Sequence, residues 1–281
     1  MFPKLLFGLA MISVVGAGCS SNQPLSPNVD SMDENATLSK TENSTVLEAS
    51  GDDSQRDHDR YDHQHEAVMF TVRIENVSTG MTLHLSNGET APAPHSPGVW
   101  TVTRTRNPLF RIGQFDAGLG LERQAEDGNP AMLAASVASL DYVKSSGVFN
   151  TPAGDVNPGP ATPGKAYEFT ISAVQGDRLS FTSMFGQSND LFYAPGEGGV
   201  PLFTEDGDPR SGNITRFIKL WDAGTEVNQE PGLGADQAPR QAAPNTGEME
   251  HNRIQRVRDE YTYPATNEVI KVTIMPASSG V

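Results

Sequence analysis

The first patterned stretch of the chain reads Val68-Met69-Phe70-Thr71-Val72-Arg73-Ile74-Glu75. Its even-numbered positions are all apolar, and three of its four odd-numbered positions are polar or charged. A period of two residues is typical of a strand that buries one face and exposes the other. The pattern therefore predicts that the chain enters a β-sheet at Val68.

Similar strand-like segments follow along the chain. They are marked by Met81, Leu83 and Leu85; by Tyr167, Phe169, Ile171 and Ala173; by Leu179 and Phe181; by residues 214–221; and by Ile270, Val272 and Ile274. Turns rich in Gly, Pro, Asn and Asp separate them, and the turn Gln175-Gly176-Asp177-Arg178 is predicted to join two strands as a hairpin. Many short strands with loop-rich connections favour a mainly β fold, specifically an antiparallel β-sandwich.

One or two short helices are predicted to interrupt the strands. Asn129 is a good N-cap and Pro130 suits the first helical position, and apolar residues recur at helical spacing over residues 131–140. A shorter helix is expected over residues 121–125, before the turn at Asp127. Both helices are expected to cover one end of a sheet.

The chain begins with the pattern of an export leader. Lys4 provides a short positive start, and residues 5–15 form an apolar run that is too short to span a bilayer. Three small residues then precede Cys19, the single cysteine, as in a bacterial lipobox. Residues 1–18 are thus predicted to be a signal peptide and Cys19 a lipidated N-terminus, with an ordinary leader followed by a chance cysteine as the alternative. The expected location is the outer membrane or cell surface as a lipoprotein, or outside the cell.

Residues 19–66 are predicted to form a disordered tether. They consist mainly of Ser, Asn, Asp, Glu and Thr, so they cannot bury enough apolar surface to offset the entropy of ordering. The last ten residues, 57–66, contain three of the six histidines beside carboxylates, which suits either transition-metal capture or, as expected here, a solvated linker. Residues 67–277 would then form the folded domain.

The composition excludes some classes of function. The 281 residues carry a formal net charge of −15, which repels phosphate backbones, so nucleic acid is not an expected partner. Such a charge suits divalent cations, cationic partners or solubility alone. The sequence contains no glycine-rich phosphate loop and no GxSxG nucleophile elbow, and the protein is predicted not to be an enzyme.

Acidic residues follow two of the strand-like runs. Asp190 belongs to Ser188-Asn189-Asp190-Leu191-Phe192-Tyr193, and Asp222 and Glu226 belong to Leu220-Trp221-Asp222-Ala223-Gly224-Thr225-Glu226. Gly224 permits a turn tight enough to aim both of the later carboxylates at one point, where Asp190 could join them. Three converging carboxylates without a basic partner need a bound cation or a raised pKa.

Calcium is the cation that these segments favour. Ca²⁺ takes about 6–8 oxygen ligands in irregular geometry, and neither segment contains the His or Cys ligands that zinc and copper prefer. The spacing alone leaves an alternative open, because most Asp-x-x-x-Glu pairs are surface charges or turn caps. On residue types, a calcium site formed by Asp190, Asp222 and Glu226 therefore stays open beside that alternative.

The string from Trp221 to Glu226, preceded by Ser188-Asn189-Asp190 ahead of an aromatic pair, resembles the N-terminal domain of the spondin family and its bacterial exported members. Residues 70–76, 126–130 and 244–247 share the resemblance, which covers about 67–276. It implies a C2-like β-sandwich with Ca²⁺ held by Asp190, Asp222 and Glu226. Glu226 stands where the animal members have Asp, which lengthens the third ligand by one methylene.

These features predict an exported, lipid-anchored, Ca²⁺-binding module for adhesion or binding at a cell surface or matrix, with an extracellular protein or glycan as its partner. The long loop over residues 230–245 is a candidate contact surface. Two alternatives stay open. One is a secreted hydrolase that uses paired carboxylates such as Asp190 and Asp222 as acid and base, and the other is a purely structural envelope protein.

Overall fold

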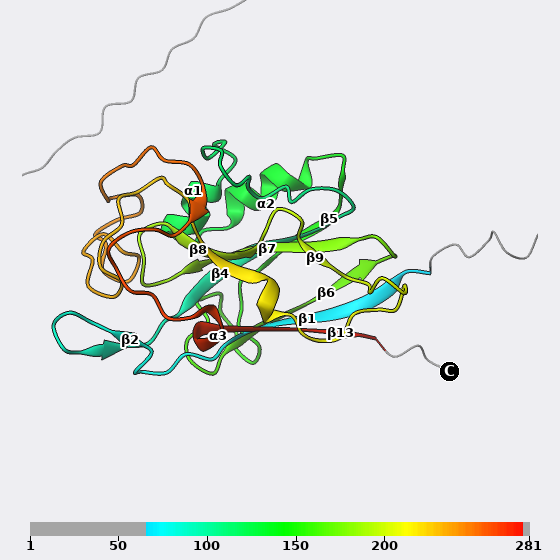
Figure 1. Cartoon of the computed structure of the whole chain (residues 1–281), viewed down its shortest axis with the longest axis horizontal. Helices are drawn as coiled ribbons and strands as arrows, with labels where there is room; N and C mark the ends of the chain where they lie inside the picture. Colours follow the sequence, from blue (N-terminus) through cyan, green and yellow to red (C-terminus); the bar gives the residue numbers. More distant parts are fainter. Residues whose placement is uncertain (1–65, 278–281) are drawn as a thin grey trace, which may run out of the picture. The chain divides into compact units, whose positions relative to one another are not determined.

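The computed structural model describes residues 66–277 (Figure 1). The predicted signal peptide, the lipidation site Cys19 and all of the predicted tether except Glu66 lie outside the described residues. Within them, every strand pair is antiparallel and the fold is mainly β, as predicted.

The alternating stretch forms β1 (Val68–Asn76), which lies inside a four-stranded sheet. The sheet has the order β10-β13-β1-β6, with β6 at Ala166–Ala173, β10 at Gly212–Asn213 and β13 at Ile270–Pro276. Phe70, Val72 and Ile74 are fully buried, whereas the residues between them are partly or fully exposed. One face of this sheet therefore meets the core and the other meets solvent, which is why its sequence alternates.

A seven-stranded sheet lies opposite, with the order β12-β11-β8-β7-β4-β5 and with β9 paired to β7. Its strands are β4 (His95–Thr103), β5 (Val143–Phe149), β7 (Arg178–Phe185), β8 (Leu191–Pro195), β9 (Val200–Pro201), β11 (Ile218–Asp222) and β12 (Gln255–Arg256). A separate two-stranded hairpin pairs β2 (Leu83–His84) with β3 (Thr90–Ala91).

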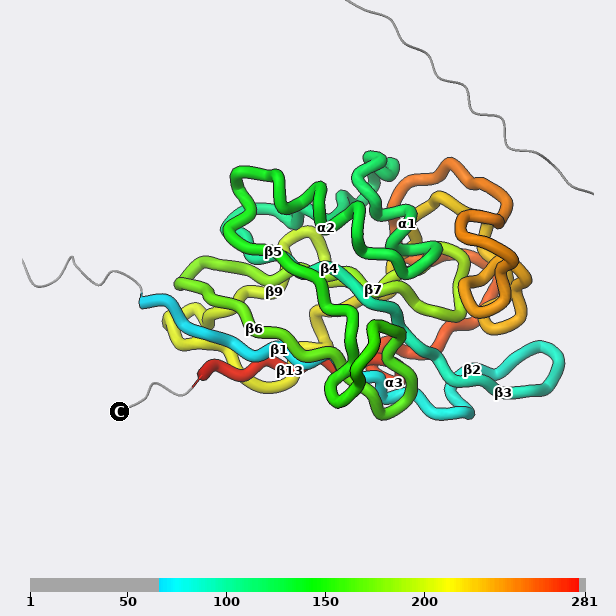
Figure 2. Tube along the Cα trace, turned by 180° about the vertical axis from the view of Figure 1, so that it is seen from behind, coloured from blue at the N-terminus to red at the C-terminus, as the bar shows by residue number. Residues whose placement is uncertain are grey.

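Both faces of the seven-stranded sheet are covered. One face packs on β1, β6 and β13, and the other packs on α1 (Leu121–Glu126) and α2 (Ala131–Ala138). Along β8, Leu191 and Tyr193 belong to the core between the sheets, whereas Phe192 and Ala194 pack with the helical layer. Figure 1 shows α1 and α2 on one side of β4, β7 and β8, and Figure 2 shows the same layers from behind.

The predicted helices are confirmed, with small shifts at their ends. α1 extends one residue beyond the predicted end, and α2 begins at Ala131 rather than Pro130. The N-cap is Pro130 and not Asn129 as predicted, although Asn129 Oδ1 accepts a hydrogen bond from the Ala131 N–H at 3.1 Å. A four-residue helix, α3 (Thr266–Val269), was not predicted.

The predicted hairpin at residues 175–178 is wrong. The strands on either side of it, β6 and β7, belong to different sheets, so this turn carries the chain across the sandwich. Asp177 stabilises the crossing, because its Oδ2 accepts a hydrogen bond from the Val174 N–H at 2.9 Å. Adjacent strands with a short turn look the same in sequence whether the turn stays in one sheet or changes sheets.

Two other strand predictions need correction. The stretch over residues 214–221 begins with a 3-10 turn, Thr215–Phe217, and becomes β11 only at Ile218. Met81 lies outside β2 and its side chain is largely exposed. No helix in residues 66–277 has the length and apolarity that crossing a bilayer requires.

Candidate metal centre

The antiparallel pairing of β8 with β11 brings the predicted acidic residues together. Asp190 directly precedes β8, and Asp222 is the last residue of β11 and pairs with Leu191, the first residue of β8. The Ala223 N–H donates to the Asp190 backbone carbonyl at 3.3 Å. Asp190 thus lies beside the loop of residues 222–226, as predicted from the sequence.

One oxygen of the Asp190 carboxylate holds this loop. Oδ2 accepts hydrogen bonds from the Thr225 N–H at 2.8 Å, the Glu226 N–H at 3.2 Å and the Thr225 hydroxyl at 3.3 Å. The loop can turn toward Asp190 because Gly224 adopts a left-handed conformation with φ of 68°. A Cβ at position 224 would also lie 2.7 Å from the Asn252 backbone, so glycine is required on both grounds.

The other oxygen, Asp190 Oδ1, has no hydrogen-bond partner although Asp190 is fully buried. Two carboxylates, Asp222 and Glu126, act on it electrostatically. Glu126, at the end of α1, is also buried, and its Oε2 likewise lacks a donor. Within residues 66–277, none of the ion pairs formed by lysine or arginine includes any of these three carboxylates.

The pKa values of this cluster are displaced upward. Burial, followed by the charge of Asp222, raises the pKa of Asp190 well above its usual value. Burial also raises the pKa of Asp222 to about 6 and that of Glu126 to about 7, and nearby acidic side chains add to both shifts. These carboxyl groups therefore hold their protons to a higher pH than free carboxyl groups do, because the fold removes water from them without supplying positive charge.

Asp222 and Glu226 have less free coordinating capacity than Asp190. The Gly224 N–H donates to Asp222 Oδ1 at 2.8 Å, and the Asn228 side-chain amide donates to Asp222 Oδ2 at 3.1 Å. The Glu226 carboxylate packs on Gly247, where a Cβ would collide with it. Burial raises the pKa of Glu226, partly offset by hydrogen bonds from Asn189 and the Gly247 backbone.

The loop predicted as a contact surface, residues 230–245, closes over this end of the sheet. The Gln229 N–H donates to Asn189 Oδ1 at 3.0 Å, and the buried Gln237 amide donates to the carbonyls of Gln229 and Glu230 at 3.2 and 2.9 Å. Asp127 Oδ1 accepts the Asn245 N–H at 3.2 Å. These bonds join the end of α1, the β7–β8 turn and the long loop around the acidic cluster.

The side chains of Asp190, Asp222 and Glu226 are not arranged to coordinate a metal ion as they stand. Residues 66–277 contain no group of three His, Cys, Asp or Glu side chains positioned to hold a metal ion as they stand. The unpartnered acceptors near the predicted site are instead Asp190 Oδ1, Glu126 Oε2 and the side-chain carbonyl of Asn228. These are hard oxygen ligands of the kind that Ca²⁺ prefers, so the donor chemistry fits the ion although the side chains have not converged.

Glu126 is the candidate ligand that sequence reasoning missed. It ends a short helix more than sixty residues before Asp190, and only the packing of α1 against β7 and β8 brings it close. The one available signal was its place in residues 126–130, a segment that contributed to the spondin resemblance. Helical position alone marks Glu126 as an ordinary surface acid.

Two pairs of side chains bear on the hydrolase alternative. Burial raises the pKa of both Asp190 and Asp222, which suits the protonated acid of such a pair but not its ionised base, and Asp190 is fully buried. His95 Nδ1 lies 3.1 Å from Ser183 Oγ, and both of these residues are also fully buried. Ser183 donates its proton to the Ser96 carbonyl at 2.6 Å. Neither pair is open to a substrate in this conformation.

Comparison with models of protein families and with curated proteins found no match to the chain. The spondin resemblance therefore stays a prediction that rests on the residues quoted for it.

Proposed function

We propose that this chain is an exported, lipid-anchored β-sandwich module whose loops are organised by one Ca²⁺ ion and bind an extracellular protein or glycan. One observation carries the metal part of this proposal. Asp190 is completely buried with an unpartnered carboxylate oxygen, beside the carboxylates of Asp222 and Glu126. A buried anion without a partner is unfavourable, and a divalent cation removes that penalty.

Each candidate ligand has a separate role in the proposal. Asp190 would bind the ion through Oδ1 while Oδ2 continues to hold the Thr225 and Glu226 N–H groups. Glu126 would add its free oxygen. Asp222 and Glu226, the other predicted ligands, would first exchange hydrogen bonds that they make within the protein.

The bound ion would be structural. It would supply the positive charge that the surrounding side chains lack, and would join the end of α1, the β7–β8 turn and the loop of residues 222–226. Because the unfolded chain cannot assemble these ligands, binding would stabilise only the folded state. Ordered loops at one end of a sandwich are well placed to contact a partner.

The metal proposal is tested by calorimetry on the purified full chain, stripped with EGTA and titrated with CaCl₂. We expect one binding event in the natural chain, loss of that heat in Asp190→Asn, and unchanged binding in Asp206→Asn, which removes an exposed acid from a turn. No binding by the natural chain would refute the calcium site. Equal losses in the two variants would show that only general surface charge attracts the ion.

The anchor is tested separately through Cys19. When expressed in a bacterium that processes lipoproteins, the natural chain should partition into the detergent phase of Triton X-114, and Cys19→Ser should partition into the aqueous phase. Equal partitioning would refute lipidation at Cys19 without affecting the calcium site. Sedimentation of the purified chain, combined with binding to cells and matrix extracts, separates an adhesion module from an envelope protein that binds only its own copies.

A further inference from the structure

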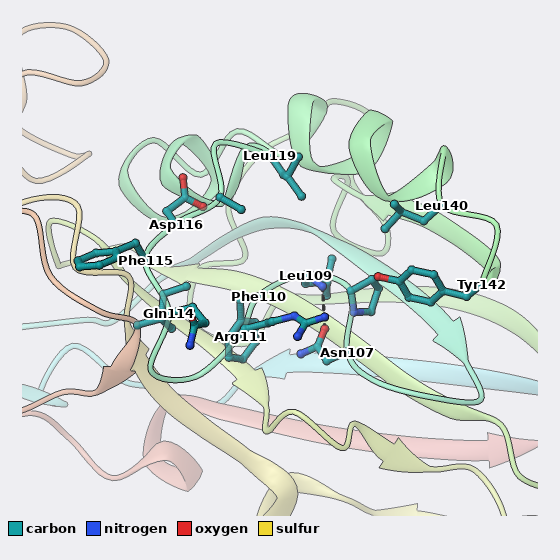
Figure 3. Close-up of a pocket in the computed structure, with 13 residues that line it drawn as sticks. Asn107, Leu109, Phe110, Arg111, Gln114, Phe115, Asp116, Leu119, Leu140 and Tyr142 are labelled. Carbon is teal, nitrogen blue, oxygen red and sulfur yellow. Dashed lines mark hydrogen bonds between the residues drawn. The ribbon is translucent and has the colours of Figure 1, made fainter.

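A hollow separate from the acidic cluster lies between the segment that follows β4 and the C-terminal end of α2. Its volume is about 220 Å³. In Figure 3, Leu119 and Leu140 lie on the helical side, and Asn107, Leu109 and Phe110 lie on the opposite side. None of the predicted calcium ligands lines it.

The interior of this hollow is apolar. Leu109, Phe110 and Ile254 are buried and belong to the core cluster beneath the helices, and Leu140 packs against that cluster. The rim contains large apolar side chains that are unusually exposed, including Leu119 at 42%. Exposed apolar groups gathered around a concave surface indicate a binding site for an apolar group.

A buried hydrogen-bond donor in the lining has no acceptor. Asn107 is 3% exposed, and its Oδ1 accepts the Leu109 N–H at 2.9 Å, which identifies the other side-chain atom as the NH₂ group. That Nδ2 makes no hydrogen bond. A buried donor of this kind calls for an acceptor, which a ligand in the hollow can supply if the side chains that cover this atom shift.

Positive charge stands beside this donor. Arg111 lines the hollow, and in Figure 3 its guanidinium group extends toward Asn107. Within residues 66–277 its guanidinium group takes part in none of the ion pairs or cation–π contacts. Arg106 lines a smaller adjoining hollow with Asn107 and Arg111, and its guanidinium carbon lies 5.4 Å from the centre of the Tyr142 ring.

Two carboxylates also lie near the hollow, and both are engaged by backbone. Asp116 Oδ2 accepts the Gly118 N–H at 3.2 Å, and burial raises the pKa of this carboxyl. Glu197 lines a smaller adjoining hollow with Asn107 and Arg111, and its Oε1 accepts the Ile112 N–H at 2.8 Å. In a chain with a net charge of −15, arginines that neither carboxylate has paired form a local site for an anion.

The aromatic rings at the rim already have neighbours within the protein. Phe115 stacks on His251 with ring centres 4.4 Å apart, and the Arg253 guanidinium carbon lies 4.7 Å from the Phe115 ring centre. The Tyr142 ring is occupied by Arg106. Because a glycan needs many polar partners and the lining of this hollow is mostly apolar, the hollow suits a more apolar ligand.

We infer that this hollow binds a small amphipathic carboxylate. The apolar body of the ligand lies against Leu109, Phe110 and Ile254, and its carboxylate pairs with Arg111, while Asn107 Nδ2 donates to it once the side chains that cover this atom shift. An engineered apolar cavity of about 150 Å³ holds benzene, so the present volume accommodates a single ring with a short acidic chain. This binding does not depend on the calcium proposal.

The test uses three ligands that share one apolar body and differ in the head group: 3-phenylpropanoate, 3-phenylpropan-1-ol and 3-phenylpropylamine. Their dissociation constants are measured on the full chain by NMR titration, in Ca²⁺ and in EGTA. For ligands of this size we expect Kd values of roughly 0.1–1 mM for the acid. The alcohol should bind at least about tenfold more weakly and the amine more weakly still.

Two variants locate the site. Arg111→Met keeps an apolar stem and should weaken the acid about tenfold while leaving the alcohol unchanged, and the matched control Arg258→Met, at an exposed arginine outside the hollow, should change neither. Leu119→Trp adds bulk at the exposed rim and should abolish binding of the acid and the alcohol. Both variants change exposed residues, so the fold should persist.

Three results would overturn the inference. They are equal affinity for the acid and the alcohol, equal effects of Arg111→Met and Arg258→Met, and no binding of the acid below about 10 mM, a concentration well above the expected range. Because the calcium site has its own test with Asp190→Asn, failure of either idea leaves the other standing.

Discussion

Asp177 and Asp190 lie at opposite ends of β7, and both are almost completely buried, at 2% and 0% exposure. At the first end, Asp177 Oδ1 is 2.6 Å from Lys144 Nζ and 3.4 Å from Arg104 Nε. At the second end, Asp190 Oδ1 faces no donor, and its charged neighbours are Asp222 and Glu126.

The two buried carboxylates differ in whether the chain itself supplies a cation to compensate their charge. Burying a carboxylate is unfavourable unless a donor or a cation compensates for the lost water. For Asp177 the chain provides its own cations on long, half-exposed side chains. For Asp190 the chain provides backbone N–H groups to one oxygen only. The remaining charge must be neutralised by a proton or by an ion from solution.

The largest expected effect comes from supplying that ion. At a Ca²⁺ concentration of 100 times Kd, binding should stabilise the folded state by about 3 kcal/mol and raise Tm by roughly 6–12 °C relative to EGTA. The increase should be absent in Asp190→Asn and intact in Asp177→Ala, because only the first change touches the proposed site. Differential scanning calorimetry measures the increase in Tm. Identical Tm values in Ca²⁺ and EGTA would contradict the prediction that a cation neutralises Asp190.

The second largest expected effect comes from removing the carboxylate of Asp177. Asp177→Ala removes both ion pairs and the acceptor for the Val174 N–H, and should destabilise the protein by about 2 kcal/mol. The cost stays moderate because Lys144 and Arg104 are half-exposed and regain water. Urea unfolding should give the same loss with and without Ca²⁺. A loss that appears only in EGTA would link the two ends, contrary to our expectation.

The third effect concerns pH in EGTA. The folded-state pKa values of Asp222 and Glu126 are raised to about 6 and about 7, so their stabilising contribution is complete below about pH 4 and is lost as pH rises through 6 and 7. We expect a loss of the order of 1–2 kcal/mol from this cluster between pH 5 and pH 8. Glu126→Gln should flatten the slope and Asp177→Ala should preserve it, as measured by urea unfolding at each pH. Stability that rises over this range would be incompatible with raised pKa values.

The smallest expected effect is the change in stability caused by Asp190→Asn in the absence of Ca²⁺. In EGTA at pH 8, Asp190→Asn should stabilise the protein by up to about 1 kcal/mol, because a neutral amide replaces a buried charge. The new amide oxygen can still accept the Thr225 N–H, and the new NH₂ group can donate to the acidic neighbours. Urea unfolding measures the change. Clear destabilisation would mean that the free oxygen already has a partner.

The four-stranded sheet was the part of the fold most readily predicted from the sequence. β1, β6 and β13 each alternate between buried and more exposed side chains, and the period of two in their sequences is visible for that reason. β7 and β8 gave weaker signals, since nearly every residue in them is buried between two layers. The hairpin predicted at Asp177 is wrong for another reason, because a short turn between two strands looks the same in sequence whether or not the chain changes sheets.

The site was predicted only in part. Asp190 and the loop from Asp222 to Glu226 do lie together, because antiparallel pairing of β8 and β11 places their ends side by side. Glu126 could not be found by spacing, because its approach depends on how α1 packs on the second sheet. Hydrogen bonds to both oxygens of Asp222 likewise depend on a folded loop.

The sequence by itself determined the alternating strands β1, β6 and β13, the helices α1 and α2, the acidic character and the chemical types of the candidate ligands, since these follow from local patterns and composition. Only the tertiary structure decided which sheet each strand joins, which acids are buried without a cation, and which oxygens remain unpartnered. The physical reason is that desolvation and hydrogen-bond satisfaction depend on distant segments packed together. Asp177 and Asp190 look alike in the chain, and only their surroundings make them different.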